Sequence, residues 1–125
     1  MRNAWHPGPA ELVRRATDAD SRKHTDSLEA PRHYLDVDDL PIDPRDSLPV
    51  PWGRPHAEAD SLMRHTTGHS LTDVGILPWQ IQWSYRRLVA ALAADSLDVP
   101  RVERLAADLG HYLGDAHVPL HTSAN

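Results

Sequence analysis

Four residues near the carboxyl end of the sequence have the types and the spacing of a metal site. His111 and Asp115 lie four positions apart in a stretch with helical periodicity, so both side chains project from one helix face about one turn apart. An imidazole nitrogen and a carboxylate oxygen at this spacing can bind one metal ion, and zinc accepts both ligand types. His117 and His121 follow on the segment where Pro119 is expected to end the helix. The residues alone leave a second interpretation open, which is a solvent-exposed His–Asp pair without a metal.

Two earlier segments add residues of the same chemical types. Asp18 and Asp20 belong to a polar run that is typical of a loop or a helix end. Further along, residues 30–39 place His33 beside several acidic residues. Taken alone, such acidic clusters are more typical of solvated loops than of binding sites.

The remaining polar residues near these motifs are given lesser roles. Asp108 lies three positions before His111 on a similar helix face, from which its carboxylate could orient an imidazole ring by a hydrogen bond. Three histidines outside the motifs are expected to be surface residues: His56, His65 and His69.

The composition limits the classes of function. The chain of 125 residues is the length of one domain, and it contains no cysteine, so that disulfides and thiolate metal sites are excluded. The net charge is −5 without a basic stripe, which disfavours a protein that grips nucleic acid through its phosphates. No Gly-x-Ser-x-Gly turn and no glycine-rich phosphate loop is present, so neither a serine nucleophile nor a nucleotide-binding loop is indicated.

The elements that must position these residues are predicted to be helices. No segment alternates apolar and polar residues as a strand would, whereas helical periodicity recurs along the chain. Residues 1–10 and the proline-rich residues 41–55 are expected to be irregular, and residues 33–38 extended or irregular. The many apolar residues of 79–94 indicate a largely buried helix. We therefore expect residues 1–125 to form a single all-α domain, with helices at 10–16, 55–68, 79–94 and 101–114.

Taken together, three segments resemble the zinc-dependent phospholipase C and S1/P1 nuclease family. They are Asp18-Ala-Asp-Ser-Arg-Lys, then Glu29-Ala-Pro-Arg-His-Tyr-Leu-Asp-Val-Asp, then Gly110-His-Tyr-Leu-Gly-Asp-Ala-His-Val-Pro-Leu-His, in the order of the family's motifs. The third is the most distinctive, because the family's pattern is His-aromatic-x-Gly-Asp followed by Val-Pro-Leu-His. Gly75-Ile-Leu-Pro-Trp and the helix after it are similar to a bacterial branch of the family.

The resemblance implies a zinc site and an all-helical fold of the phospholipase C/P1 nuclease type. Asp115 would also bridge to a neighbouring zinc ion, which makes it the residue expected to be catalytic, and His121 would bind the remaining zinc. Members of the family hold up to three zinc ions, so zinc is the expected cofactor. The first zinc would be bound by Asp20 (or Asp18 in its place), His33, His111 and Asp115.

The resemblance further implies a chain that is incomplete at both ends. The family's opening tryptophan binds zinc, but Trp5 lies too close to Asp20 in the sequence for that role. The family also has zinc ligands downstream of the motif that ends at His121. One complete zinc site is therefore expected here.

The expected function is hydrolysis of phosphate esters by zinc-activated water. The substrate would be a phospholipid or a single-stranded nucleic acid, and no stable protein partner is implied. Two alternatives stay open: a catalytically inactive fragment that binds zinc, and a helical interaction domain without a metal. Family members are often secreted or periplasmic, whereas no apolar secretory signal opens this sequence.

Overall fold

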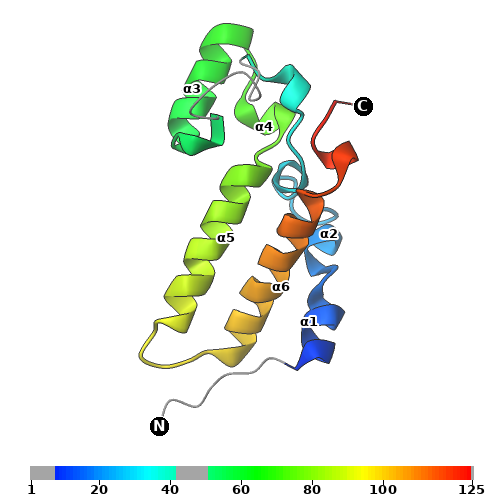
Figure 1. Ribbon diagram of the computed structural model, residues 1–125, viewed down its shortest axis with the longest axis vertical. Coiled ribbons are helices and arrows are strands. Elements are labelled where there is room, and N and C mark those ends of the chain that lie inside the picture. The colour runs from blue at the N-terminus through cyan, green and yellow to red at the C-terminus, as the bar shows by residue number, and fades with distance from the viewer. Residues whose placement is uncertain (1–7, 42–50, 125) are drawn as a thin grey trace.

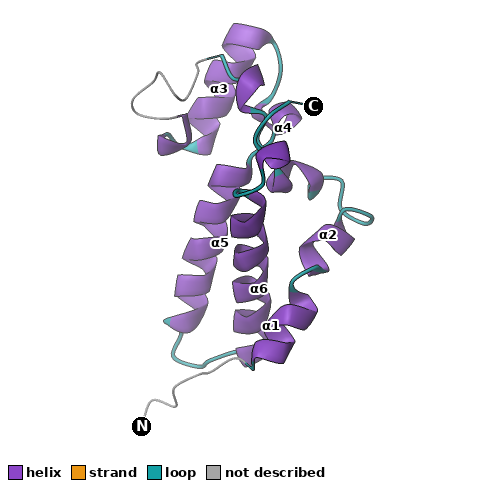
Figure 2. Cartoon of the chain, turned by 45° about the vertical axis from the view of Figure 1, so that its right-hand side comes forward, coloured by secondary structure: helices purple, strands orange, loops and turns teal. Residues whose placement is uncertain are grey.

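The computed structural model describes residues 8–41 and 51–124, and every regular element within these ranges is helical (Figures 1 and 2). The prediction of an all-α chain is therefore confirmed. The α-helices are α1 (Pro9–Arg15), α2 (Asp18–Arg22), α3 (His56–Thr67), α4 (Leu71–Val74), α5 (Leu77–Leu92) and α6 (Val99–Asp115). Short 3-10 turns lie between them: η1 (Ala30–His33), η2 (Val37–Asp39), η3 (Pro51–Gly53) and η4 (Pro119–His121).

The two longest helices, α5 and α6, run antiparallel and side by side (Figure 1). The sequence explains where α6 begins, because the Asp98 carboxylate accepts a hydrogen bond of 3.0 Å from the Arg101 backbone N–H and Pro100 occupies the first turn. The short helices α1 and α2 pack along α6. A small core joins these elements through Ala19, Leu77 and Tyr112, which are each at most 1% exposed.

A second core closes one end of the molecule. It fills the space between α3, α4 and the start of α5, where Trp79 is 2% exposed and donates its indole N–H to the Arg54 carbonyl at 2.9 Å. The other buried members are Leu35, Ala59, Met63, Leu71, Val74 and Ile76. This core holds the segment after His33 in place through Leu35.

The segment around His33 is fixed by backbone hydrogen bonds to the turn between α4 and α5. The Ile76 N–H donates to the Pro31 carbonyl at 2.7 Å, and the Leu77 N–H donates to the Tyr34 carbonyl at 3.1 Å. This close approach requires Gly75, which has a φ of 96°, because a Cβ there would lie 2.1 Å from the Tyr34 carbonyl oxygen. A glycine in the turn between α4 and α5 thus determines where η1 lies.

The structure departs from the sequence-based expectations in three places. The helix expected to be largely buried, α5, has exposed apolar side chains on one side: Tyr85 at 59%, Val89 at 46% and Leu92 at 46%. Residues 33–38, expected to be extended or irregular, are so at 34–36, whereas the segment begins in the 3-10 turn η1 and ends in the 3-10 turn η2. Pro9 already belongs to α1, and the 3-10 turn η3 lies within residues 41–55, which were expected to be irregular; residues 1–7 and 42–50 lie outside the described residues.

No helix in the described ranges is both long enough and apolar enough to span a membrane.

Candidate metal centre

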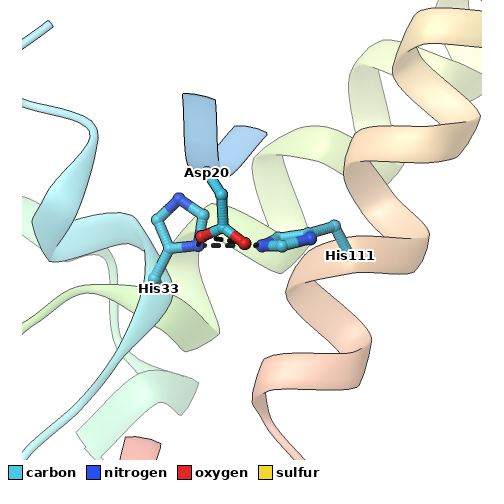
Figure 3. A group of neighbouring side chains, drawn as sticks. All are labelled: Asp20, His33 and His111. Carbon is cyan, nitrogen blue, oxygen red and sulfur yellow. Dashed lines mark hydrogen bonds and ion pairs between the residues drawn. The ribbon is translucent and has the colours of Figure 1, made fainter. Parts of the chain in front are cut away.

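Two helical segments near the start of the chain and one near its end bring four candidate ligands together. Asp20 extends from α2, His33 is the last residue of η1, and His111 and Asp115 lie one turn apart on α6. Figure 3 shows the carboxylate of Asp20 between the rings of His33 and His111. Ligand atoms of these three residues all lie within 4.8 Å of one another. Both α2 and η1 pack against α6, which explains the convergence.

The distances between these ligand atoms fit a tetrahedral zinc site. With metal–ligand bonds of about 2.0–2.1 Å, the ligand atoms of a tetrahedron are about 3.3 Å apart. His111 Nε2 lies 3.1 Å from His33 Nδ1 and 3.3 Å from Asp115 Oδ2. Asp115 Oδ2 is 2.8 Å from His33 Nδ1, and Asp20 Oδ1 is 3.7 Å and 3.6 Å from the two ring nitrogens. These five distances lie near the edge length of such a tetrahedron.

The outward-facing nitrogen of each histidine ring is held by an oxygen acceptor. The Nε2–H of His33 donates to the Glu29 carboxylate at 3.1 Å, and the Nδ1–H of His111 donates to the Ala16 carbonyl at 2.7 Å. Both acceptors are oxygens without a proton to donate, so each outer nitrogen carries the hydrogen of its bond. The two inner nitrogens face one point, where Asp115 Oδ2 lies 2.8 Å from His33 Nδ1 and 3.3 Å from His111 Nε2. This is the arrangement that metal-binding histidines show in proteins.

Glu29 is a buried carboxylate that supports His33 from the side away from the candidate ligands. It is fully buried, and it accepts hydrogen bonds from the Tyr112 hydroxyl, from Arg22 at 3.2 Å and from Arg32 at 2.6 Å. Burial by itself would raise the pKa of Glu29, but these hydrogen bonds outweigh it and lower the pKa to about 2. Glu29 is therefore an anion at neutral pH and holds the His33 ring with a charge-assisted hydrogen bond.

Asp20 provides the solvent-accessible side of the cluster. Its side chain is 50% exposed, whereas those of His33, His111 and Asp115 are 2%, 12% and 14% exposed. Lys23 lies 2.7 Å from Asp20 Oδ1, and this hydrogen bond lowers the pKa of the Asp20 carboxyl. The cluster is thus held by hydrogen bonds on the buried side and exposed to solvent on the side of Asp20.

The structure distinguishes between the two aspartates that the sequence left open. Asp18 lies on the other side of α2, where its carboxylate is 3.7 Å from Arg15. Asp20, not Asp18, is the aspartate that faces the histidines.

The two histidines after α6 lie outside the cluster. His117 is exposed, and its Nδ1 lies 2.6 Å from the Leu113 carbonyl one turn before it. The His121 carbonyl accepts a hydrogen bond of 2.9 Å from the Leu35 N–H, but its ring has no hydrogen bond or ion pair with the four candidate ligands in the described part of the chain. The assignment of His121 to a different zinc ion stays a prediction.

Two sequence-based assignments are wrong. Asp108 does not orient an imidazole, because its carboxylate binds the Arg22 guanidinium at 3.1 Å. The residue in that role is Glu29, which was quoted in a motif but given no function. The sequence does carry a signal for this role, because Glu29 lies four positions before His33.

His56 is not a free surface residue, because its ring packs against Trp79 and Trp83 with centroids 5.9 Å and 5.3 Å away.

The cluster combines two imidazoles and two carboxylates around one point, a set of borderline and hard ligands that suits zinc when cysteine is absent. Asp20 and Asp115 would supply two negative charges to offset those of a dication. Comparisons of the chain with protein-family models, with curated proteins and with solved structures found no match.

Proposed function

We propose that this chain binds one zinc ion through Asp20, His33, His111 and Asp115, and that it is a hydrolase of phosphate esters that depends on this ion. The observation that carries the proposal is the convergence of two ring nitrogens, His33 Nδ1 and His111 Nε2, which lie 3.1 Å apart and each within 3.7 Å of carboxylate oxygens of Asp20 and Asp115. Two imidazole nitrogens and two carboxylates that face one point can share a single cation. Zinc is the biological cation whose preferred ligands and geometry agree best with the cluster.

A zinc ion held here would lower the pKa of a bound water and offset negative charge on a phosphate ester. The residues of the chain have separate parts in this proposal. Glu29 and the Ala16 carbonyl fix the two imidazole rings, so their inner nitrogens do not have to reorient. Asp115 lies against both histidines, and its Oδ2 is closer to the ring nitrogens of His33 and His111 than the Asp20 carboxylate is. Asp20, on the exposed side, is where a substrate would approach.

The substrate class is supported by the sequence resemblance rather than by the shape of the site. The three motifs of the phospholipase C and S1/P1 nuclease type contain all four candidate ligands in order. Both phospholipids and single-stranded nucleic acids are substrates within that family. We therefore propose a phosphodiester as the substrate, with no protein nucleophile.

A second candidate function is a structural zinc site without catalysis. It is favoured by the count of four protein ligands, which can complete a tetrahedral shell, whereas catalytic sites commonly keep one position open. The ligands also come from three separate segments that a metal ion would hold together. The exposed Asp20 side chain argues for the catalytic proposal, since zinc can expand its shell on an accessible side.

Hydrolysis of bis(p-nitrophenyl) phosphate, phosphatidylcholine vesicles and single-stranded DNA separates the two candidates. The zinc-loaded chain is compared with His111→Ala and with His117→Ala, which removes an exposed histidine six residues away. We expect one of the three substrates to be hydrolysed by the wild-type chain and by His117→Ala, and not by His111→Ala. Zinc binding without turnover of any substrate would support the structural candidate and refute hydrolysis.

A further inference from the structure

On the other side of Tyr112 from the candidate ligands lies a cleft of about 970 Å³. Two of its walls are one face of α5 and one face of α6, the helices that lie side by side in Figure 1, and residues of α2, η1, α3 and α4 contribute to the lining. The α6 residues on this face have the spacing of a single helix stripe, with Arg101, Arg104 and Asp108 at intervals of three and four. On α5, Trp83 and Arg87 lie four positions apart.

The lining of the cleft is strongly basic in a protein that is acidic overall. Six arginines and only two carboxylates, Glu29 and Asp108, line it, although the whole chain has a net charge of −5. Both carboxylates are already bound by Arg22, and Glu29 by Arg32 as well. No acidic side chain of the lining is therefore free to neutralise the other arginines.

Four guanidinium groups in the cleft have no partner within residues 8–41 and 51–124. None of them makes an ion pair or a side-chain hydrogen bond there, whereas Arg14, Arg15, Arg22, Arg32 and Arg64 all bind carboxylates. Four like charges around one cleft repel each other, and a polyanion would remove this repulsion. The unpartnered groups are Arg86, Arg87, Arg101 and Arg104.

We propose that this cleft binds a small molecule that carries two or more phosphate groups. Guanidinium groups bind phosphate oxygens in pairs of parallel hydrogen bonds, and four of them match a chain of phosphates better than a single one. The volume lies within the range of small-molecule sites, about 300–1,000 Å³. The half-buried ring of Trp83 also lines the cleft and is the aromatic group against which a nucleotide base could stack.

This site is distinct from the candidate metal centre. Glu29 and Tyr112 lie between the two, because Glu29 faces His33 with one oxygen and the cleft arginines Arg22 and Arg32 with the other. The four unpartnered arginines do not contact Asp20, His33, His111 or Asp115 in the described structure. Phosphate binding in the cleft can therefore be tested whether or not zinc binds.

Calorimetric titration with inorganic triphosphate at about 0.15 M salt, where surface charges are screened beyond about 8 Å, tests the proposal. The double variant Arg101→Ala/Arg104→Ala removes two exposed cleft charges, and Arg14→Ala/Arg64→Ala removes two exposed charges elsewhere. We expect the cleft variant to bind at least about tenfold more weakly, since each lost charged hydrogen bond costs about that factor. We expect the control variant to bind within about twofold of wild type, because its changes leave the cleft intact. Binding of triphosphate at the metal centre would be common to all three proteins and would cancel in the comparison.

Titration with ATP shows whether the bound molecule is a nucleotide or a bare polyphosphate. ATP that binds more tightly than triphosphate, with this advantage lost in Trp83→Ala, would identify a nucleotide, and equal binding would identify a polyphosphate chain alone. The proposal is overturned if the wild-type chain shows no saturable binding or if both double variants weaken binding equally. It is also overturned if inorganic phosphate binds as well as triphosphate, or if single-stranded DNA is the tighter ligand.

Discussion

At the scale of single residues, the hydrogen-bond partners of the two histidines decide what the cluster can do. His33 and His111 each give their outer N–H to an oxygen that only accepts, which directs both inner nitrogens at the carboxylates of Asp20 and Asp115. The supporting carboxylate, Glu29, is fully buried and bound by two arginines and a tyrosine. The position of the His33 ring is thus fixed by hydrogen bonds on the buried side of the cluster.

Replacing the supporting carboxylate should weaken zinc binding without removing a ligand. Glu29→Gln keeps the shape of the side chain but loses the charge that holds the His33 ring. Outer partners of this kind are worth about 10–100-fold in metal affinity. Competition with a chromogenic chelator would measure the change. Glu58→Gln, the same substitution on an exposed glutamate of α3, should leave the affinity unchanged. An unchanged affinity in Glu29→Gln would show that Glu29 does not support the site.

The lowered pKa of Glu29 predicts a specific acid sensitivity. Its folded-state pKa is about 2 against an ordinary value of 4.5, so its contribution to stability is complete above about pH 4.5 and is lost as the pH falls towards 2. Urea unfolding of wild type and Glu29→Gln at a series of pH values, with chelator present to exclude zinc release, should show this. The free energy of unfolding of wild type should fall more steeply than that of the variant between pH 4.5 and 2. Parallel curves would contradict the ionised state of Glu29.

The sequence predicted which residue types form the cluster, but not which side of α2 faces it or which carboxylate supports the histidines. The spacing of His111 and Asp115 on one helix face was sufficient to place two ligands together. The choice between Asp18 and Asp20 could not be made, because it depends on which side of α2 faces α6. Asp108 was misassigned because a distant arginine, Arg22, binds it. Long-range partners of this kind leave no trace in local spacing.

At the scale of elements, the turn between α4 and α5 positions η1 and therefore His33. Gly75 combines a positive φ with a contact that leaves no room for a Cβ against Tyr34. Gly68, the residue after α3, has a φ of 80° but open space around it. The two glycines thus separate the effect of backbone conformation from the effect of close approach.

Alanine substitutions at these glycines should differ in cost. Gly68→Ala should destabilise the chain by about 1–2 kcal/mol, which is the cost of a left-handed conformation for an L-residue. Gly75→Ala adds the clash with the Tyr34 carbonyl and should cost more than about 3 kcal/mol. It should also lower the zinc content, because His33 moves with η1. Denaturant unfolding and elemental analysis measure both effects. Equal costs at the two sites would mean that the η1 contact is not needed for the fold.

Helix ends were predictable where the sequence carries a local signal. Asp98 and Pro100 predicted the start of α6, and Gly68 predicted the end of α3. The 3-10 turns of residues 30–39 were not predicted, since they depend on hydrogen bonds to residues 74–77, about forty positions away. The exposed side of α5 was not predicted either, because apolar content alone does not show which neighbours cover a helix.

At the scale of the whole molecule, the candidate ligands connect α2, η1 and α6. These segments also meet through the small core of Ala19, Leu77 and Tyr112 and through hydrogen bonds of Arg22 and Glu29. A metal ion that binds the folded chain but not the unfolded one adds its binding free energy to the stability. Metal removal should therefore affect the whole fold and not only the site.

Chelation should lower the melting temperature of the zinc-loaded chain. Zinc at about 100 times its dissociation constant adds about 2.7 kcal/mol, which corresponds to a shift of about 10 °C for a chain of this size. Thermal unfolding followed by circular dichroism, with and without chelator, measures the shift. Added zinc should restore the original value, and Asp20→Asn should respond less than wild type. A melting temperature that chelator leaves unchanged would indicate a helical domain without a metal.

The zinc content of the purified chain after dialysis, measured by elemental analysis beside His111→Ala and His117→Ala, tests the central claim most directly. A four-ligand site predicts about one zinc per chain in wild type and in His117→Ala, and none in His111→Ala. A folded wild-type chain without zinc, or a His111→Ala chain that retains it, would contradict the assignment of Asp20, His33, His111 and Asp115 as a zinc site.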